Sequence, residues 1–245
     1  MRQLYAQTSM RLVTQNVRGL TPEKLEMIIH TMKDRGIHAA ALQETWAAVP
    51  PGRDNDEIDG FLIIRHGETV RSCNRGRLGV VIILSPIARL AWEARGELVR
   101  KDREVRVMAV DLALEGHRTL RLGSTCSPAT GASSDEGQAF YDGVTRYSVG
   151  GGPRVILAIG MDGSASIGVG KWADRRAPER RPGRPVEPRG LRHQNNAGRK
   201  LLALMSVLRR RPFSRVGAAR HGFTHVLGSR AVWDTGSCGS PALAG

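Results

Sequence analysis

The chain has 245 residues, which is enough for one large α/β or β-sandwich domain or two small ones, for a sizeable core, and for an enzyme. Lysine and arginine number 37 against 23 acidic residues, so the net charge of +14 points to a polyanion as partner. No apolar run approaches the roughly 18 residues of a membrane span, and the first residues lack the apolar stretch typical of a signal peptide. We therefore expect a soluble intracellular protein, nuclear or cytoplasmic, with no membrane partner. The three cysteines lack CxxC spacing and indicate neither a disulfide framework nor a zinc site: Cys73, Cys126 and Cys238.

The first predicted elements are a strand, a helix and a second strand. Residues 10–17 alternate apolar and polar side chains, as a strand with one buried face does. The helix predicted over 21–36 begins with Thr21 as N-cap and Pro22 in the first helical position, and a glycine ends it. The second strand is predicted over 37–45.

Strands outnumber helices in the rest of the chain. The continuous apolar runs at 80–84 and 155–159 predict central strands covered on both faces. We therefore predict an α/β protein built as a layered sandwich, in a single domain spanning 1–245. Further strands are predicted at 60–66, 76–85, 104–114, 120–128 and 154–160, and helices at 134–147 and 196–211.

The positive charge is concentrated late in the chain. Residues 171–220 carry 15 lysines or arginines and three acidic residues, so this segment holds most of the net charge. Its first part, 171–195, is rich in proline and arginine and lacks apolar periodicity, which predicts a flexible insert. Two interpretations of the segment stay open: a solvated linker, or a strip that contacts the phosphates of a nucleic acid.

Three polar side chains follow buried strands at the point where each strand ends. They are Asn16, Glu44 and Asp162. Acids at strand ends often only cap turns, but two carboxylates and an amide are the hard oxygen ligands that Mg²⁺ prefers. Loops at one edge of a sheet are also where sites are commonly built, so the three residues are candidates for a metal and phosphate site.

These residues lie in segments that resemble motifs of the endonuclease/exonuclease/phosphatase superfamily. "LVTQNVRGL" (12–20) resembles the motif in which a strand ends in Asn followed by Val-Arg-Gly, and "ALQET" (41–45) resembles the Leu-Gln-Glu metal motif. "LGSTCSP" (122–128) stands where the family has a strand ending in Tyr-Ala-Pro, and "FYDGV" (140–144) resembles the helix that follows. These segments also follow one another along the chain in the same order as the motifs of the family.

The later segments continue the resemblance. "VILAIGMDGSASIG" (155–168) resembles the Gly-Asp-Phe-Asn motif. "NNAGRKLLALM" (195–205) is similar to a helix of the non-LTR retrotransposon branch, which includes craniofacial development protein 2-like sequences, and "HGFTHVLGSRAVWD" (221–234) loosely resembles the segment after it. The resemblance thus covers residues 10 to about 234.

The resemblance implies a four-layer, DNase I-like α/β sandwich and Mg²⁺-dependent phosphodiester hydrolysis, with Mn²⁺ as a substitute and DNA as the nucleic acid that is nicked. Asn16 would orient the scissile phosphate or the catalytic acid, and Glu44 would bind the metal. Asp162 would contribute to the metal site and position or deprotonate the attacking water. Gln43, which precedes Glu44, would not bind the metal itself but would hold Glu44 in position.

The chain also departs from the family pattern. Ser164 stands at the catalytic position where the family has an amide, and Cys126 replaces a tyrosine beside the phosphate. Asp234 is the candidate for the penultimate aspartate, and no Ser-Asp-His follows it. We therefore expect a C-terminally truncated or degenerate member with impaired activity. The alternative is a catalytically inactive relative that binds nucleic acid nonspecifically through its basic segment.

Three other features have ordinary explanations. His221 and His225 are four residues apart, but their segment is glycine-flanked and β-like, which favours surface or core histidines over a metal site. "GVGKW" (168–172) is too short for a phosphate-binding loop and predicts a turn. Cys126 has no identifiable base in the sequence, so a buried strand cysteine is favoured over a nucleophile.

Overall fold

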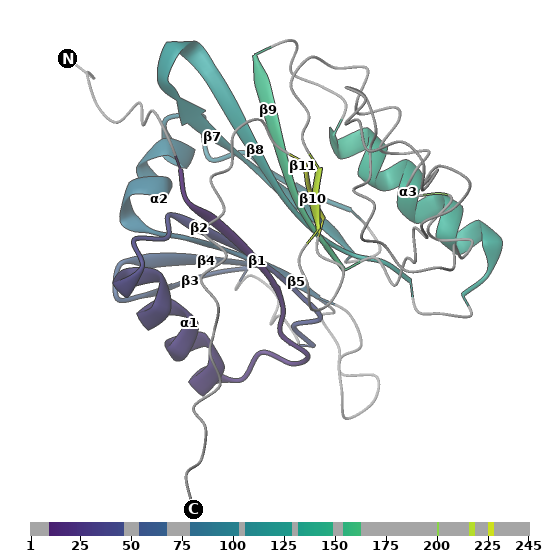
Figure 1. Ribbon diagram of the computed structural model, residues 1–245, viewed down its shortest axis with the longest axis horizontal. Helices are drawn as coiled ribbons and strands as arrows, with labels where there is room; N and C mark the ends of the chain where they lie inside the picture. Colours follow the sequence, from purple (N-terminus) through teal and green to yellow (C-terminus); the bar gives the residue numbers. More distant parts are fainter. Residues whose placement is uncertain are drawn as a thin grey trace, which may run out of the picture.

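Two mixed β-sheets face one another in the computed structural model, and a helix covers the outer side of each (Figure 1). The order of the layers is helix α1, first sheet, second sheet and helix α3, which confirms the predicted layered α/β class. The structure describes residues 10–46, 54–67, 79–102, 106–128, 132–148, 154–162, 200, 216–218 and 225–227. Within these residues, none of the helices has the length and apolar character needed to cross a membrane.

The first sheet has the strand order β1-β2-β5-β4-β3. Strands β1 and β2 are parallel, because helix α1 connects them, and the other neighbours are antiparallel. The parallel pair therefore brings the C-terminal ends of β1 and β2 to the same edge. The bounds are β1 Leu12–Asn16, α1 Pro22–Asp34, β2 Ala39–Gln43, β3 Asn55–Ile58, β4 Phe61–His66 and β5 Val80–Leu84.

The second sheet has the strand order β6-β7-β8-β9, and its last pair is parallel. Helix α3 forms the crossover between β8 and β9 and packs over the outer face of this sheet (Figure 1). Strands β10 and β11 pair with each other, and β11 lies beside β9. The bounds are α2 Pro86–Glu93, β6 Val99–Lys101, β7 Val107–Leu114, β8 Arg118–Cys126, α3 Ser134–Ser148, β9 Val155–Asp162, β10 Val216–Ala218 and β11 His225–Leu227, with a 3-10 turn at Glu115–His117.

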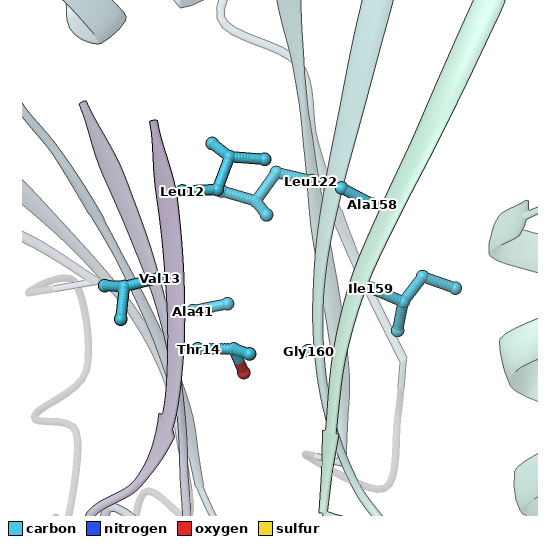
Figure 2. A pocket seen from close by; sticks show the side chains of 8 residues that line it. All are labelled: Leu12, Val13, Thr14, Ala41, Leu122, Ala158, Ile159 and Gly160. Atoms are coloured by element: carbon cyan, nitrogen blue, oxygen red, sulfur yellow. The ribbon is translucent and has the colours of Figure 1, made fainter. Parts of the chain in front are cut away.

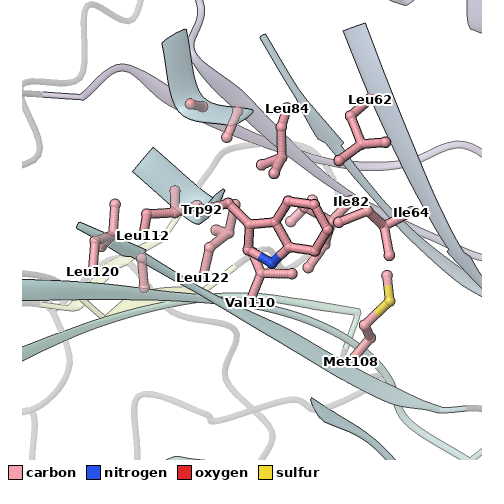
Figure 3. Packing of buried hydrophobic residues seen from close by; sticks show 14 of the residues in the cluster. Leu62, Ile64, Ile82, Leu84, Trp92, Met108, Val110, Leu112, Leu120 and Leu122 are labelled. Atoms are coloured by element: carbon pink, nitrogen blue, oxygen red, sulfur yellow. The ribbon is translucent and has the colours of Figure 1, made fainter. Parts of the chain in front are cut away.

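The main core lies between the two sheets (Figure 3). Alternate residues of β7 and β8 point into it, and the indole of Trp92 of α2 lies between side chains of the two sheets. A second cluster lies between α1 and the outer face of the first sheet. The inner residues labelled in the figure include Leu62, Ile64, Ile82 and Leu84 from the first sheet and Met108, Val110, Leu112, Leu120 and Leu122 from the second.

Helix α1 forms as the sequence predicts. The side chain of Thr21 accepts a hydrogen bond from the Lys24 N–H at 3.3 Å, and Pro22 takes the first helical position. Gly36 has φ +59°, a backbone conformation that glycine tolerates at the end of a helix. The buried stripe has helical spacing and faces the first sheet: Leu25, Ile28, Ile29 and Met32.

Helix α2 and the edge strands β3 and β6 were not among the predicted elements. The signal for α2 is present in the sequence, since Ser85 caps the helix by accepting from the Ala88 N–H at 3.3 Å and Pro86 follows it. The two edge strands have four and three residues and no continuous apolar run. Such short strands are recognised by their pairing with neighbours rather than by their own pattern.

A buried ion pair fastens the second sheet to α3. Arg121 donates from Nε to Asp111 Oδ1 at 2.7 Å and from Nη2 to Oδ2 at 2.9 Å, and its Nη1 donates to the Tyr147 carbonyl at 3.1 Å. Burial alone would raise the pKa of Asp111, but the hydrogen bonds and charge of Arg121, with Arg100 beside it, hold that pKa below its usual value. The outer face of this sheet is therefore held to its helix by charge as well as by apolar contact.

Several predictions lie outside the described residues. They include the basic insert 171–195, the residues Ser164 and Asp234, and the helix predicted over 196–211 except for Lys200, which is helical. The segment around His225 is described only at β11, where the predicted β conformation is confirmed.

Candidate active site at one end of the sandwich

The C-terminal ends of β1, β2 and β9 lie at one end of the sandwich. In the parallel β1-β2 pair, Asn16 lies opposite Gln43, so Glu44 follows directly beside Asn16. Across the sandwich, Leu12 lies at the level of Ala158, and Thr14 lies at the level of Gly160 (Figure 2). Strands β1 and β9 therefore run in the same direction.

This arrangement places the backbone of Asp162 at the same end as Asn16 and Glu44. Asp162 is the last residue of β9 and pairs with Cys126 of β8. Its side chain is outside the described part of the structure. The structure thus brings together the three strand ends that carry the predicted site residues, and it does so through two separate parallel pairs, one in each sheet.

Gln43 joins the two sheets directly behind Glu44. Its side chain is fully buried, and its Nε2 donates to Ser124 Oγ in β8 at 3.1 Å and to Thr14 Oγ1 in β1 at 3.1 Å. Ser124 in turn donates to the Leu42 carbonyl at 2.7 Å. A buried amide with its donors satisfied holds its neighbours in one arrangement, so this network sets the spacing of β1, β2 and β8 beneath the site. Neither Thr14 nor Ser124 was singled out from the sequence.

Glu44 has a left-handed backbone conformation with φ 52°. Such a conformation is costly for a residue other than glycine and persists only where the surroundings enforce it. Here the Gly19 N–H donates to the Glu44 carbonyl at 2.7 Å, and the Leu20 N–H donates to the Thr45 carbonyl at 2.8 Å. These two hydrogen bonds from the loop after β1 hold the backbone at Glu44, whose side chain is half-buried.

Asn16 shapes the loop that holds this turn. Its Oδ1 accepts a hydrogen bond from the Arg18 N–H at 3.0 Å. The ammonium group of Lys24 donates to the carbonyls of Val17 at 3.0 Å and Gly19 at 2.9 Å. Lys24 occupies the position where a capping box would have Glu or Gln, and its side chain instead stabilises the loop after β1.

Cys126 is buried, with 6% of its surface exposed, and belongs to the core between the sheets. Its thiol donates a weak hydrogen bond to the Ser127 carbonyl at 3.9 Å. Burial in the core agrees with the strand-cysteine interpretation of the sequence. Its register position opposite Asp162 places it at the same end of the sandwich as the candidate site.

A second polar bridge crosses the sandwich at this end, and the sequence alone did not suggest it. His66 ends β4 opposite Val80, the residue that also pairs with Gln43. The Nε2 of His66 lies 3.1 Å from Asp102 Oδ1 and 2.9 Å from the Asp102 carbonyl, after strand β6 of the other sheet. Asp102 is held by the N–H groups of Arg106 and Val107, both at 3.0 Å. Only the pairing of strands far apart in the chain brings these groups together.

The sequence matches no family model and no curated protein. Solved structures do match it. AP endonuclease LMAP from Leishmania major matches with a TM-score of 0.54 at 13% identity, covering 89% of this chain and 78% of that one. An AP endonuclease from Archaeoglobus fulgidus matches with a TM-score of 0.52 at 13% identity, covering 90% and 87%.

The chain has the DNase I-like fold. At 13% identity the similarity concerns the arrangement of the two sheets and their helices, and the chemistry has to be argued from the residues of this chain.

The donor set at the strand ends of this DNase I-like fold suits a hard cation. Among the described residues, no group of three or more His, Cys, Asp or Glu side chains converges as a metal cage. Mg²⁺ does not require one, because it is commonly bound through one or two carboxylates and completes its coordination with water and substrate phosphate. Glu44 supplies one such carboxylate, and the end of β9 delivers a second acid, Asp162, to the same end of the sandwich.

Proposed function

We propose that this protein is a Mg²⁺-dependent phosphodiester hydrolase that nicks DNA, related to the endonucleases of the non-LTR retrotransposon branch. The observation that carries the proposal is the convergence of the β1, β2 and β9 ends, which bear Asn16, Glu44 and Asp162, at one end of the sandwich. The two matched structures are named AP endonucleases, and this supports DNA as the substrate class.

Each strand end has a distinct task in this proposal. Glu44 holds Mg²⁺, with Mn²⁺ as a substitute, and a bound metal supplies polarisation of a phosphoryl oxygen and stabilisation of the leaving group. Asn16 orients the scissile phosphate through its amide. Asp162 fixes and deprotonates the attacking water. Gln43 positions Glu44 through its bonds to Thr14 and Ser124.

A nicking assay tests the proposal. The full chain is incubated with supercoiled plasmid and Mg²⁺ beside the isosteric variants Glu44→Gln and Asp162→Asn. We expect slow nicking by the wild type, because Ser164 replaces an amide, and loss of nicking in both variants. Glu57→Gln, an exposed acid on the edge strand β3, is the matched control and should nick like the wild type. Wild-type nicking no faster than that of the two site variants would contradict the proposal.

One observation favours a second candidate, a catalytically inactive relative that binds nucleic acid nonspecifically. Cys126, at the predicted tyrosine position, is buried in the core and offers only a weak donor. The basic segment 171–220 would then carry the whole function. This candidate predicts DNA binding whose affinity falls steeply with salt in the absence of any nicking. Affinity that hardly changes between 50 and about 200 mM salt would rule it out.

A further inference from the structure

An exposed tryptophan stands beside the candidate site. Trp46 follows Glu44 by two residues, and 37% of its surface is exposed. It is the one aromatic residue among the exposed large apolar side chains of the described residues, in a chain with only 4% aromatic content. Its indole N–H makes no hydrogen bond within the described part of the chain, although this group usually finds a partner when it is buried.

The backbone holds this ring in a defined place. Trp46 has φ 51°, a backbone conformation that is rare for a bulky residue and that persists only where the surrounding structure enforces it. The six-membered part of its ring lies over Gly19, since a Cβ atom built on Gly19 would stand 3.0 Å from Trp46 Cε3 and 3.5 Å from Cζ3. Gly19 itself has φ +90°, so both the space and the backbone at that position require glycine.

A positively charged side chain lies in the loop after β1, next to the glycine that the Trp46 ring covers. Arg18 precedes Gly19, is exposed, and also has a left-handed backbone, with φ 45°. Its guanidinium makes no hydrogen bond or ion pair to any of the described residues. Lys24 holds the carbonyls of Val17 and Gly19 on either side of Arg18, so the loop that carries the exposed guanidinium is fixed.

We infer that Trp46 and Arg18 together bind one nucleotide of the DNA next to the phosphate that is cleaved; this rests on the proposed function. The exposed indole face stacks on a base that is accessible at a single-stranded or opened position, and Arg18 takes the adjoining phosphate. Base stacking on aromatic side chains is largely independent of sequence, whereas a guanidinium contributes through charge. The pair would therefore favour single-stranded or opened DNA over intact duplex.

The two contributions are separable by equilibrium binding. Fluorescence anisotropy of a labelled single-stranded oligonucleotide and its duplex is measured with the full chain in EDTA, so that no cleavage occurs. We expect Trp46→Ala to weaken single-strand binding by about 5- to 150-fold, with an unchanged salt slope. Arg18→Gln should reduce the slope of log K against log salt by about 0.7, the value for one phosphate contact on a single strand.

Matched variants separate stacking from a merely structural role. Trp46→Phe keeps an aromatic face and should retain most of the affinity, whereas Trp46→Leu keeps apolar cover over Gly19 and should lose it. Leu98→Ala and Arg95→Gln, which change exposed residues near the end of α2, should bind like the wild type. Oligonucleotide binding should also quench part of the tryptophan emission in the wild type and not in Trp46→Phe.

The outcomes distinguish this inference from the function on which it rests. Wild-type binding and nicking that Trp46→Ala and Trp46→Leu leave unchanged would overturn the nucleotide contact and keep the hydrolase. Equal losses in Trp46→Phe and Trp46→Leu would also overturn it, because the aromatic face would then be irrelevant. A wild type that neither binds nor nicks DNA would overturn both.

Discussion

Gly160 of β9 lies so close to Thr14 of β1 that the position has no room for a side chain. A Cβ atom built on Gly160 would stand 2.8 Å from Thr14 Cβ and 2.9 Å from Gln43 Nε2. This close contact between the two sheets lies beneath the candidate site. Glycine at position 160 therefore sets the distance between the strand that ends in Asn16 and the strand that ends in Asp162.

The variant Gly160→Ala should destabilise the fold. The added methyl group would have to displace Thr14 or break the hydrogen bonds of Gln43, and overpacking of this kind costs about 1–3 kcal/mol. Urea denaturation gives the change in the free energy of unfolding. Gly123→Ala in the neighbouring strand β8 is the control, because its nearest neighbour would be 3.5 Å away, an ordinary contact. Equal stability of the two variants would contradict the close approach.

The variant Gln43→Leu should lower the free energy of unfolding by about 1–3 kcal/mol, because buried hydrogen bonds to Thr14 and Ser124 are lost without replacement. A double-mutant cycle with Ser124→Ala should give a coupling energy of about 0.5–3 kcal/mol. Thr31→Ala, which removes an exposed hydroxyl on α1, is the control and should have little effect. Additive effects of Gln43→Leu and Ser124→Ala would show that the two side chains act independently.

The left-handed backbone at Glu44 predicts an unusual order of stability. Glu44→Gly should be more stable than Glu44→Ala by about 1 kcal/mol, because glycine adopts φ 52° without steric cost. The same pair of substitutions at Glu26, in the middle of helix α1, should give the opposite order by about 1 kcal/mol. Thermal and urea unfolding measure both pairs. An identical order at the two positions would argue against strain at Glu44.

His38 should make the protein less stable as the pH falls below about 6.5, the ordinary pKa of histidine. Burial lowers the pKa of His38, with the charge of Arg11 as a second cause, and its Nδ1 accepts the Arg11 N–H at 2.9 Å. Because the folded pKa lies below the unfolded one, the contribution is complete above the unfolded pKa of about 6.5 and is lost as the pH falls through the folded pKa.

The substitution His38→Asn tests this contribution. Asn offers a carbonyl oxygen to the Arg11 N–H and does not titrate in this range. As the pH is lowered from 7, the free energy of unfolding should therefore fall less in His38→Asn than in the wild type. His38→Gln, whose longer side chain places the amide elsewhere, should be less stable than His38→Asn at pH 7 but equally insensitive to pH. The same pH dependence in the wild type and in His38→Asn would assign the effect to other groups.

Local signals explain which parts of the fold could be predicted. Helix α1 is marked by Thr21, Pro22 and a buried stripe at helical spacing, and all three lie within one segment. Strands β5 and β9 show as continuous apolar runs. The predicted central position is confirmed for β5 but wrong for β9, which is the last strand of its four-stranded sheet and is only partly buried at 155–157. Strand β3 has three polar residues and one isoleucine, alternately exposed and partly exposed, and becomes a strand through its ladder with β4. Local patterns carry no information about such a partner.

The residues of the candidate site also fall into those that the sequence could predict and those that it could not. Asn16, Glu44 and Asp162 could be singled out because each follows a strand and belongs to a segment that resembles a known motif. Ser124 and the His66–Asp102 bridge could not, because their partners are distant in the chain: Ser124 lies 81 residues from Gln43, and Asp102 lies 36 residues from His66.

The sequence by itself determined the order of the longer strands and of helices α1 and α3, the N-cap of α1 and the residues that end the buried strands, because periodicity and capping are properties of neighbouring residues. Tertiary structure alone decided that β1 and β9 run in the same direction on facing sheets, that Gly160 fits against Thr14, and that Trp46 lies over Gly19. The first two relationships depend on how the two sheets pack against each other, and the third depends on how the loops after β1 and β2 meet. Packing requires complementary shapes of residues that are far apart in the sequence.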